Sequence, residues 1–185
     1  MGRSRTGARG GSREPAPARP PSPSLASATL PRVWQGVGYR PLPDPAPARP
    51  LFDFAALAWP AAPAFAWGAF ADEDGERLVG ALLAERSGPS ALLHGPVVLT
   101  ERGPADPLET AAQLVAAALD HATALGAVTI FARPQGLDRV WVRFGFIPVP
   151  EVTLPAALAG RTGAGLYAWR GGSALWTLRE AAAEA

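Results

Sequence analysis

The sequence contains no cysteine, no lysine and only two histidines, His94 and His121, among its 185 residues. Without cysteine there is no disulfide bond, no thiolate nucleophile and no metal site built on sulfur. The two histidines are the only imidazole groups that can act as a base or bind a metal. We therefore expect no metal site, and any imidazole base has to be one of these two residues.

A cluster of acidic residues does not change this expectation. Asp72, Glu73, Asp74 and Glu76 crowd into a few positions that also hold Gly75. They lack the ligand spacing of a calcium-binding loop, and Asp-Gly is a common hairpin turn. We interpret this segment as the solvated tip of a hairpin.

Long apolar runs are also missing. No stretch has the length of a transmembrane helix, and the first residues lack the apolar core of a secretory signal. Residues 1–32 carry six Arg and one Glu, a net charge of +5, whereas residues 33–185 carry eleven Arg and fifteen acids, a net charge of −4. A mildly acidic body argues against nucleic acid binding. We expect a cytoplasmic protein that binds neither membrane nor nucleic acid.

The first 31 residues differ in composition from the rest of the chain. They contain six Pro, four Gly and five Ser and no apolar run. Such a segment cannot bury enough apolar surface to offset the entropy lost on ordering, so residues 1–31 are predicted to be a disordered tail.

The body begins with a meander of strands. Residues 33–42 have the pattern of a first strand, followed by a Pro-rich connector and a possible helical turn over 52–58. Three further strands are predicted over 64–70, 77–85 and 91–100, joined by tight turns. They are apolar on both faces, so we expect a helix or loop to cover each side of the sheet.

The most regular helix pattern in the chain follows the meander. Apolar residues recur at helical spacing from Leu108 to Leu125. Asp106 is a good N-cap, Pro107 suits the first helical position, Glu109 completes a capping box, and Gly126 ends the helix. Residues 127–133 form a β-branched strand, which should run parallel to the preceding strand because a long helix connects the two.

The last part of the chain is predicted from shorter patterns. A short helix with Trp141 at its centre precedes the sequence Arg-Phe-Gly-Phe, and Gly145 suits the position just after a helix. Strands are predicted over 146–152 and 163–170, and a C-terminal helix over 173–185. The fold class is α/β (α+β) with a mixed sheet.

Residues 64–149 resemble the GNAT superfamily of N-acyltransferases. In that family a meander is followed by a cofactor-side helix, a strand, a short helix and a Gly-Phe that enters the next strand, here Gly145-Phe146. The resemblance implies a GNAT-like domain over 32–172. The segment is also similar to the FemAB-like branch of acyltransferases through Gly95-Pro96-Val97, Gly145-Phe146 and Thr153.

The resemblance also implies a site for acetyl-CoA or another acyl-CoA. The end of the strand at Val97, Val98 and Leu99 and the loop residues Arg102, Gly103 and Ala105 match the family pattern. Two features depart from it. Asp106 and Pro107 stand at the helix start that should receive the pyrophosphate, and Trp141 stands where the family places a Tyr that protonates the leaving thiolate.

Few residues qualify as the base that takes the proton of the acceptor amine. Glu85 and His94 lie in strands that should border a cleft, whereas His121 lies beside Asp120 on the long helix and is expected to be partly solvated. The alternative for Glu85 is a surface ion pair with Arg86 or Arg77, and for His94 a structural, hydrogen-bonded role.

Two functions therefore remain open. One is transfer of an acyl group, most simply acetyl, from acyl-CoA to a small-molecule or peptide amine. The other is a non-catalytic module of the same fold that mediates interaction or homodimerisation after losing the CoA site.

Overall fold

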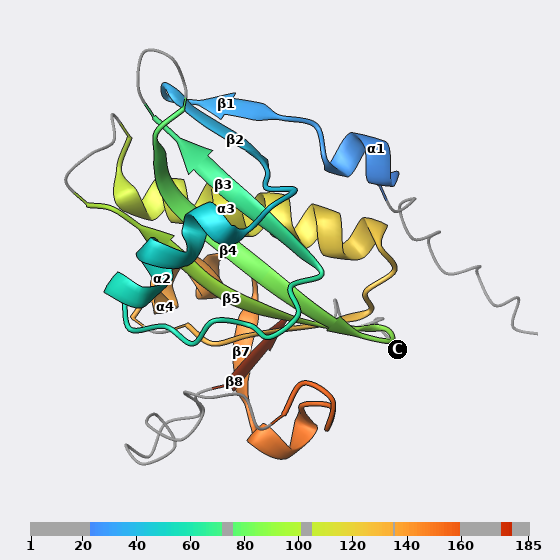
Figure 1. The fold of residues 1–185 in the computed structure, drawn as a ribbon. Coiled ribbons are helices and arrows are strands. Elements are labelled where there is room, and N and C mark those ends of the chain that lie inside the picture. Colours follow the sequence, from blue (N-terminus) through green and yellow to red (C-terminus); the bar gives the residue numbers. More distant parts are fainter. Residues whose placement is uncertain (1–22, 72–75, 101–104, 135, 160–174, 179–185) are drawn as a thin grey trace, which may run out of the picture.

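The computed structural model describes residues 23–71, 76–100, 105–134, 136–159 and 175–178, and these residues form a mixed α/β fold. Eight strands form one sheet in the order β1-β2-β3-β4-β5-β6-β8-β7 (Figure 1). All neighbouring strands are antiparallel except β5 and β6. The strands are β1 Arg32–Trp34, β2 Val37–Pro41, β3 Phe65–Phe70, β4 Leu78–Ser87, β5 Ser90–Val98, β6 Thr129–Ala132, β7 Phe146–Val149 and β8 Leu175–Leu178.

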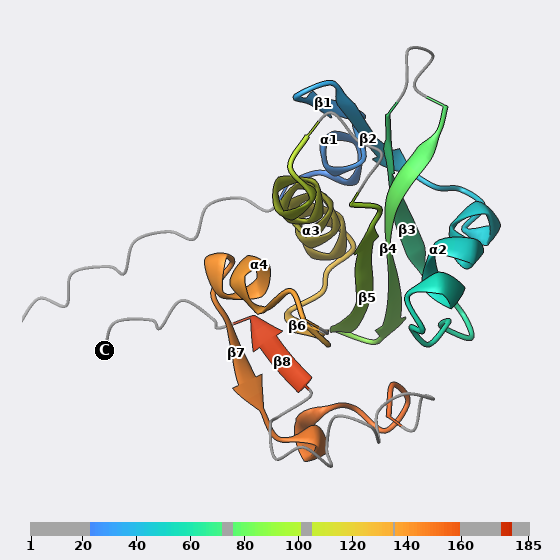
Figure 2. The ribbon, with the colours of Figure 1, turned by 90° about the vertical axis from the view of Figure 1, so that its left-hand side faces the viewer.

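The helices cover both faces of the sheet. They are α1 Leu25–Ala28, α2 Arg49–Phe54, α3 Pro107–Ala124 and α4 Asp138–Arg143, with 3-10 turns η1 Ala46–Ala48 and η2 Glu151–Thr153. The long helix α3 lies against one face of β3, β4 and β5, and α2 lies against the other (Figure 2). The strands of the meander are therefore buried on both faces, as their apolar sequences predicted.

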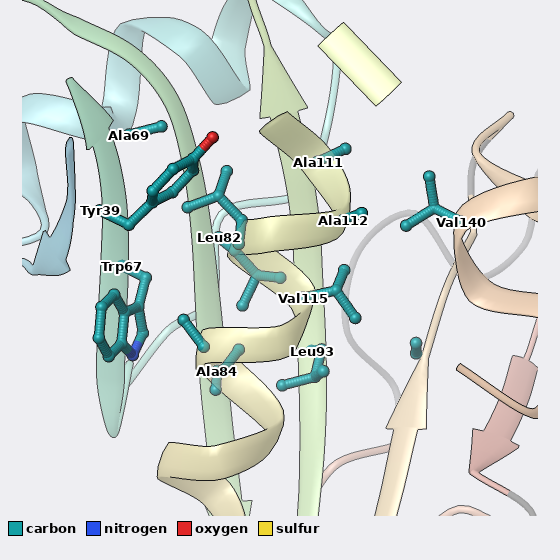
Figure 3. Close-up of a cluster of buried hydrophobic side chains, with 14 of the residues drawn as sticks. Tyr39, Trp67, Ala69, Leu82, Ala84, Leu93, Ala111, Ala112, Val115 and Val140 are labelled. Atoms are coloured by element: carbon teal, nitrogen blue, oxygen red, sulfur yellow. The ribbon is translucent and has the colours of Figure 1, made fainter. Parts of the chain in front are cut away.

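The main core lies between α3 and the sheet. Side chains of Tyr39, Trp67, Leu82 and Leu93 face the helix, where Val115 packs among them (Figure 3). Many of the helix positions in this core are alanine, so the backbone of α3 lies close to the strands. Two smaller apolar clusters lie elsewhere, one under α2 and one around Leu154 and Leu158.

The first strand differs from the prediction. Residues 32–41 form a hairpin of two strands, β1 and β2, instead of one strand. Gln35 and Gly36 at the turn both have positive φ, 48° and 76°. This is the geometry of a type I′ turn, for which Asn-Gly is the usual sequence. The pair Gln-Gly gave a weaker signal, and the turn was missed.

The helix α3 confirms the predicted end signals. The Asp106 side chain accepts a hydrogen bond from the Leu108 backbone N–H, Pro107 is the first helical residue, and Gly126 has a φ of +84°. Glu109 does something different from the expected capping box, because its carboxylate accepts a hydrogen bond from Arg143 of α4 at 2.6 Å. The strand β6 pairs in parallel with β5, as expected for a helical crossover.

The short helix α4 is also confirmed. Trp141 is fully buried and meets Phe146 edge-on, with ring centroids 4.8 Å apart. Gly145 follows the helix with a φ of +84°, a conformation that costs a side-chain-bearing residue energy. A helix of this length has little stability of its own, so packing of Trp141 into the core holds it in place.

The C-terminal prediction was wrong. Residues 175–178, expected to belong to a helix over 173–185, form the strand β8. This strand lies between β6 and β7 and is antiparallel to both. Leu175 packs in the cluster around Leu154 and Leu158, whereas Trp176 and Leu178 pack against the main core, so the strand has no alternating pattern. Four residues are also too few to distinguish strand from helix. The strand predicted over 163–170 lies outside the described residues.

The boundary of the predicted N-terminal tail also needs correction. Residues 1–22 lie outside the described part of the chain, but α1 forms within the segment expected to be disordered. Ser24 caps this turn by accepting a hydrogen bond from the Ser27 N–H, and Ala28 is buried. The turn packs against α3, so ordered structure begins before Arg32.

Candidate functional site

Strands β5 and β6 separate halfway along β5. Their pairing runs from Ser90 opposite Thr129 to Leu93 opposite Ala132, whereas β5 continues to Val98. Within the part of the chain that the structure describes, the second half of β5 has no strand on this side. It therefore leaves an open edge inside the sheet, close to the start of α3.

Two residues of β5 form a bulge at this point. In the pairing of β4 with β5, Ala81 lies opposite Val97 and Leu83 lies opposite His94. Two residues of β5, Gly95 and Pro96, therefore lie opposite the single residue of β4 between that pair of positions. Gly95 has a φ of +94°, and an added Cβ would lie 3.1 Å from the Ala81 carbonyl oxygen. Glycine is therefore required here both by the backbone conformation and by the close approach of β4.

A cavity of about 430 Å³ lies along this open edge. Its lining extends from one face of the sheet to the other: Ala55 and Leu57, just after α2, lie on one side, and Leu108 and Ala111 of α3 lie on the other. The remaining lining residues are Gly95, Pro96, Val97, Val98, Thr100, Asp106, Pro107, Pro134 and Leu137. The separation of β5 from β6 thus opens a site reached from both layers of helices.

The structure brings only some of the predicted cofactor residues to this cavity. Val97 and Val98 line it. Leu99 packs against the apolar cluster under α2, and Ala105 is buried in the main core, so neither lines the cavity. Arg102 and Gly103 lie outside the described residues.

The start of α3 is only partly suited to a diphosphate. Asp106 Oδ1 accepts the Leu108 N–H at 3.0 Å, so this donor is already used by a carboxylate. Pro107 has no N–H at the first helical position. The apolar walls fit the chain of an acyl thioester, whereas the carboxylate of Asp106 disfavours an anionic group beside it.

Glu85 and His94, proposed separately as bases, form a buried pair. Glu85 Oε2 lies 3.0 Å from His94 Nε2, and the two side chains are 2% and 9% exposed. Glu85 on β4 and His94 on β5 are diagonal neighbours, because Glu85 pairs with Leu92. Glu85 therefore does not lie at the surface, as the alternative of a surface ion pair required. His94 does not line the cavity itself, but Gly95, the next residue, does.

His121 is buried, which corrects the expectation of partial solvation. Its Nδ1 accepts a hydrogen bond from Trp67 Nε1 at 3.2 Å, and its ring stacks on Phe65 with centroids 4.2 Å apart. Burial lowers the pKa of His121, so the ring is neutral and carries its proton on Nε2. The neighbouring Asp120 pairs instead with Arg32 near the surface. His121 borders a second, smaller cavity of about 210 Å³, and four of the nine described residues that line it are prolines.

Trp141 packs in the hydrophobic core and does not serve as a proton donor. Its indole Nε1 is buried and has no hydrogen-bond partner within the described ranges. Indole does not release a proton at ordinary pH, and Trp141 does not line the cavity. The described residues contain no group of His, Asp and Glu side chains that could hold a metal ion. None of the helices described is both long and apolar enough to cross a membrane.

Comparisons of the chain with protein-family models, with curated proteins and with solved structures gave no match.

Proposed function

We propose that this protein transfers an acyl group from an acyl thioester such as acyl-CoA to an amine. The observation that carries the proposal is the apolar cavity along the open edge of β5, beside the start of α3. The succession of meander, long helix, parallel strand and short helix, followed by Gly145-Phe146, is what the resemblance to GNAT acyltransferases led us to expect, and it supports the same reading.

The open edge suits a thioester. Among the residues that the structure describes, the backbone groups of β5 beyond Leu93 have no partner strand on the β6 side, and the bulge at Gly95 and Pro96 turns them away from a regular ladder. An extended thioester arm lying there can form hydrogen bonds with the strand edge, as added strands do. The thioester carbonyl then lies between the α2 side and the α3 side of the sheet.

The Glu85–His94 pair supplies a base for the reaction. With Glu85 ionised, His94 Nε2–H donates to Oε2, which leaves Nδ1 as the basic nitrogen. The amine nitrogen attacks the thioester carbonyl, its proton passes through a water to His94 Nδ1, which does not line the cavity itself, the new C–N bond forms and the C–S bond breaks. The thiolate leaves without an acid, because a thiol has a pKa low enough for a good leaving group.

A non-catalytic module of the same fold is the second candidate. It is favoured by Asp106, whose carboxylate already uses a backbone N–H at the helix start, and by Trp141, which cannot protonate a thiolate. In this case the cavity and the buried pair are structural, and the module binds another protein or a second copy of itself.

Ligand binding separates the two candidates. Isothermal titration of the full chain with acetyl-CoA, CoA and desulfo-CoA should give measurable binding of all three, with the acyl-CoA tightest. His94→Gln should then lower the rate of acyl transfer to a panel of amines more than it lowers acyl-CoA affinity. No heat of binding for any acyl-CoA up to 1 mM would reject the acyltransferase and leave the non-catalytic module.

A further inference from the structure

We infer that the acyl group transferred is an apolar chain well beyond the length of acetyl. This inference rests on the proposed acyltransferase function and names its donor more closely. It follows from the described lining of the cavity, from the exposed apolar side chain of Leu108 at its mouth and from the single charge among the described lining residues.

The lining is almost wholly apolar. Of the thirteen described residues that line the cavity, eleven are aliphatic, proline or glycine, and the two polar ones are Thr100 and Asp106. Water gains little from such apolar walls, so an apolar ligand that covers them is favoured. An acetyl group has one methyl and would fill little of a cavity of about 430 Å³, whereas a longer chain removes its own surface and the walls from water.

The mouth of the cavity is apolar as well. Leu108, which lines the cavity, is a large apolar side chain that is 43% exposed. It belongs to α3, and a chain that enters beside it covers apolar surface that an acetyl group is too short to reach.

The charge at the cavity points to the same kind of ligand. Asp106 is the one charged residue among the described residues that line the cavity, and it is acidic. The described lining therefore offers an anionic group no cation to pair with, and it attracts a ligand through apolar contact.

Titration of the full chain with acetyl-CoA, butanoyl-CoA, octanoyl-CoA and CoA tests the inference. Full burial of one methylene corresponds to roughly fourfold in affinity, so octanoyl-CoA should bind at least tenfold more tightly than acetyl-CoA even if only part of the chain enters. Octanoyl-pantetheine, which lacks the diphosphate, should keep most of this gain. If acetyl-CoA and octanoyl-CoA bind within twofold of each other, the inference is wrong and the proposed function stands. If none of the thioesters binds, both fail.

A variant that fills the cavity distinguishes binding of the acyl chain inside the cavity from nonspecific binding to apolar surface elsewhere. Ala55 is exposed and borders the cavity, so Ala55→Trp adds volume without disturbing the core. It should reduce octanoyl-CoA affinity by tenfold or more, and more than it reduces acetyl-CoA affinity. Ala61→Trp, at an exposed alanine away from the cavity, is the matched control and should leave both affinities unchanged. Equal octanoyl-CoA affinity of the two variants, with wild-type melting temperatures, would overturn the inference.

Discussion

His94 Nε2 and Glu85 Oε2 lie 3.0 Å apart across two central strands, and both side chains are at least nine-tenths buried. In this buried environment each side chain stabilises the other. Removing one partner leaves the second buried away from water with fewer interactions to offset the cost of its desolvation. The pair is therefore expected to matter for folding as well as for any chemistry.

A double-mutant cycle measures this dependence. Replacing either residue by leucine should lower the free energy of unfolding by about 3–5 kcal/mol, whereas Glu85→Leu combined with His94→Leu should cost about 1–3 kcal/mol less than the sum of the two. Urea denaturation of the four proteins gives the numbers. Additive losses, within about 0.5 kcal/mol, would show that the two groups do not act together.

Trp141 tests how the short helix is held. Trp141→Ala should lower the free energy of unfolding by roughly 3–5 kcal/mol, because a large buried ring is lost. Trp141→Phe should cost much less, since it keeps most of the apolar ring and removes an N–H that has no partner in the described structure. Val142→Ala, at an exposed position of the same helix, is the control and should stay within about 0.5 kcal/mol of wild type. An equally small effect of Trp141→Ala would mean that α4 does not depend on this ring.

His121 should make the protein less stable in mild acid. Burial lowers the pKa of His121 in the folded protein, so the unfolded chain binds the proton first. The stability associated with the neutral ring is complete above the unfolded pKa of about 6.5 and is lost as pH falls from there toward the folded pKa. His121→Gln, which keeps an acceptor for Trp67 Nε1, should flatten this part of the curve of melting temperature against pH. The same acid slope in wild type and variant would assign it to other groups.

Asp106 should limit binding of a phosphorylated donor. For a dissociation constant of about 100 μM, 1 mM acyl-CoA stabilises the fold by about 1.4 kcal/mol, or roughly 3–6 °C in melting temperature. Asp106→Ser keeps a capping oxygen and removes the charge, so it should enlarge the ligand-induced shift. Asp106→Gly should do the same with a cap weaker by a few tenths of a kcal/mol. A smaller shift in both variants would mean that the carboxylate helps to hold the ligand.

The parts of the fold that follow from local sequence were predictable. The long helix α3 combines an apolar stripe with clear signals at both ends, and the meander is punctuated by Gly and Pro. The hairpin at Gln35 and the strand at Leu175 were missed for different reasons: Gln is an uncommon residue for a type I′ turn, and a four-residue strand has no measurable period.

The sequence indicated a few residues near the candidate cavity but not the contacts between them. Glu85 and His94 could be selected because the chain has so few bases, yet their pairing depends on the register of β4 against β5, which runs unbroken from Ser87 opposite Ser90 to Leu83 opposite His94. His121 was misjudged because its neighbour Asp120 is polar. The burial of His121 comes from Trp67 and Phe65, which lie more than fifty residues earlier in the chain.

The position of β8 sets the order in which the sheet can be completed. Because β8 lies between β6 and β7, the strand β7 has no direct pairing with β6 among the described residues and pairs with the sheet through residues 175–178. A chain that has been synthesised only as far as Val149 thus holds all of β7 but lacks the strand with which β7 pairs. Contacts that span such a separation form late and slowly. A synthetic peptide of residues 175–178 would therefore compete with β8 for its place between β6 and β7 during folding.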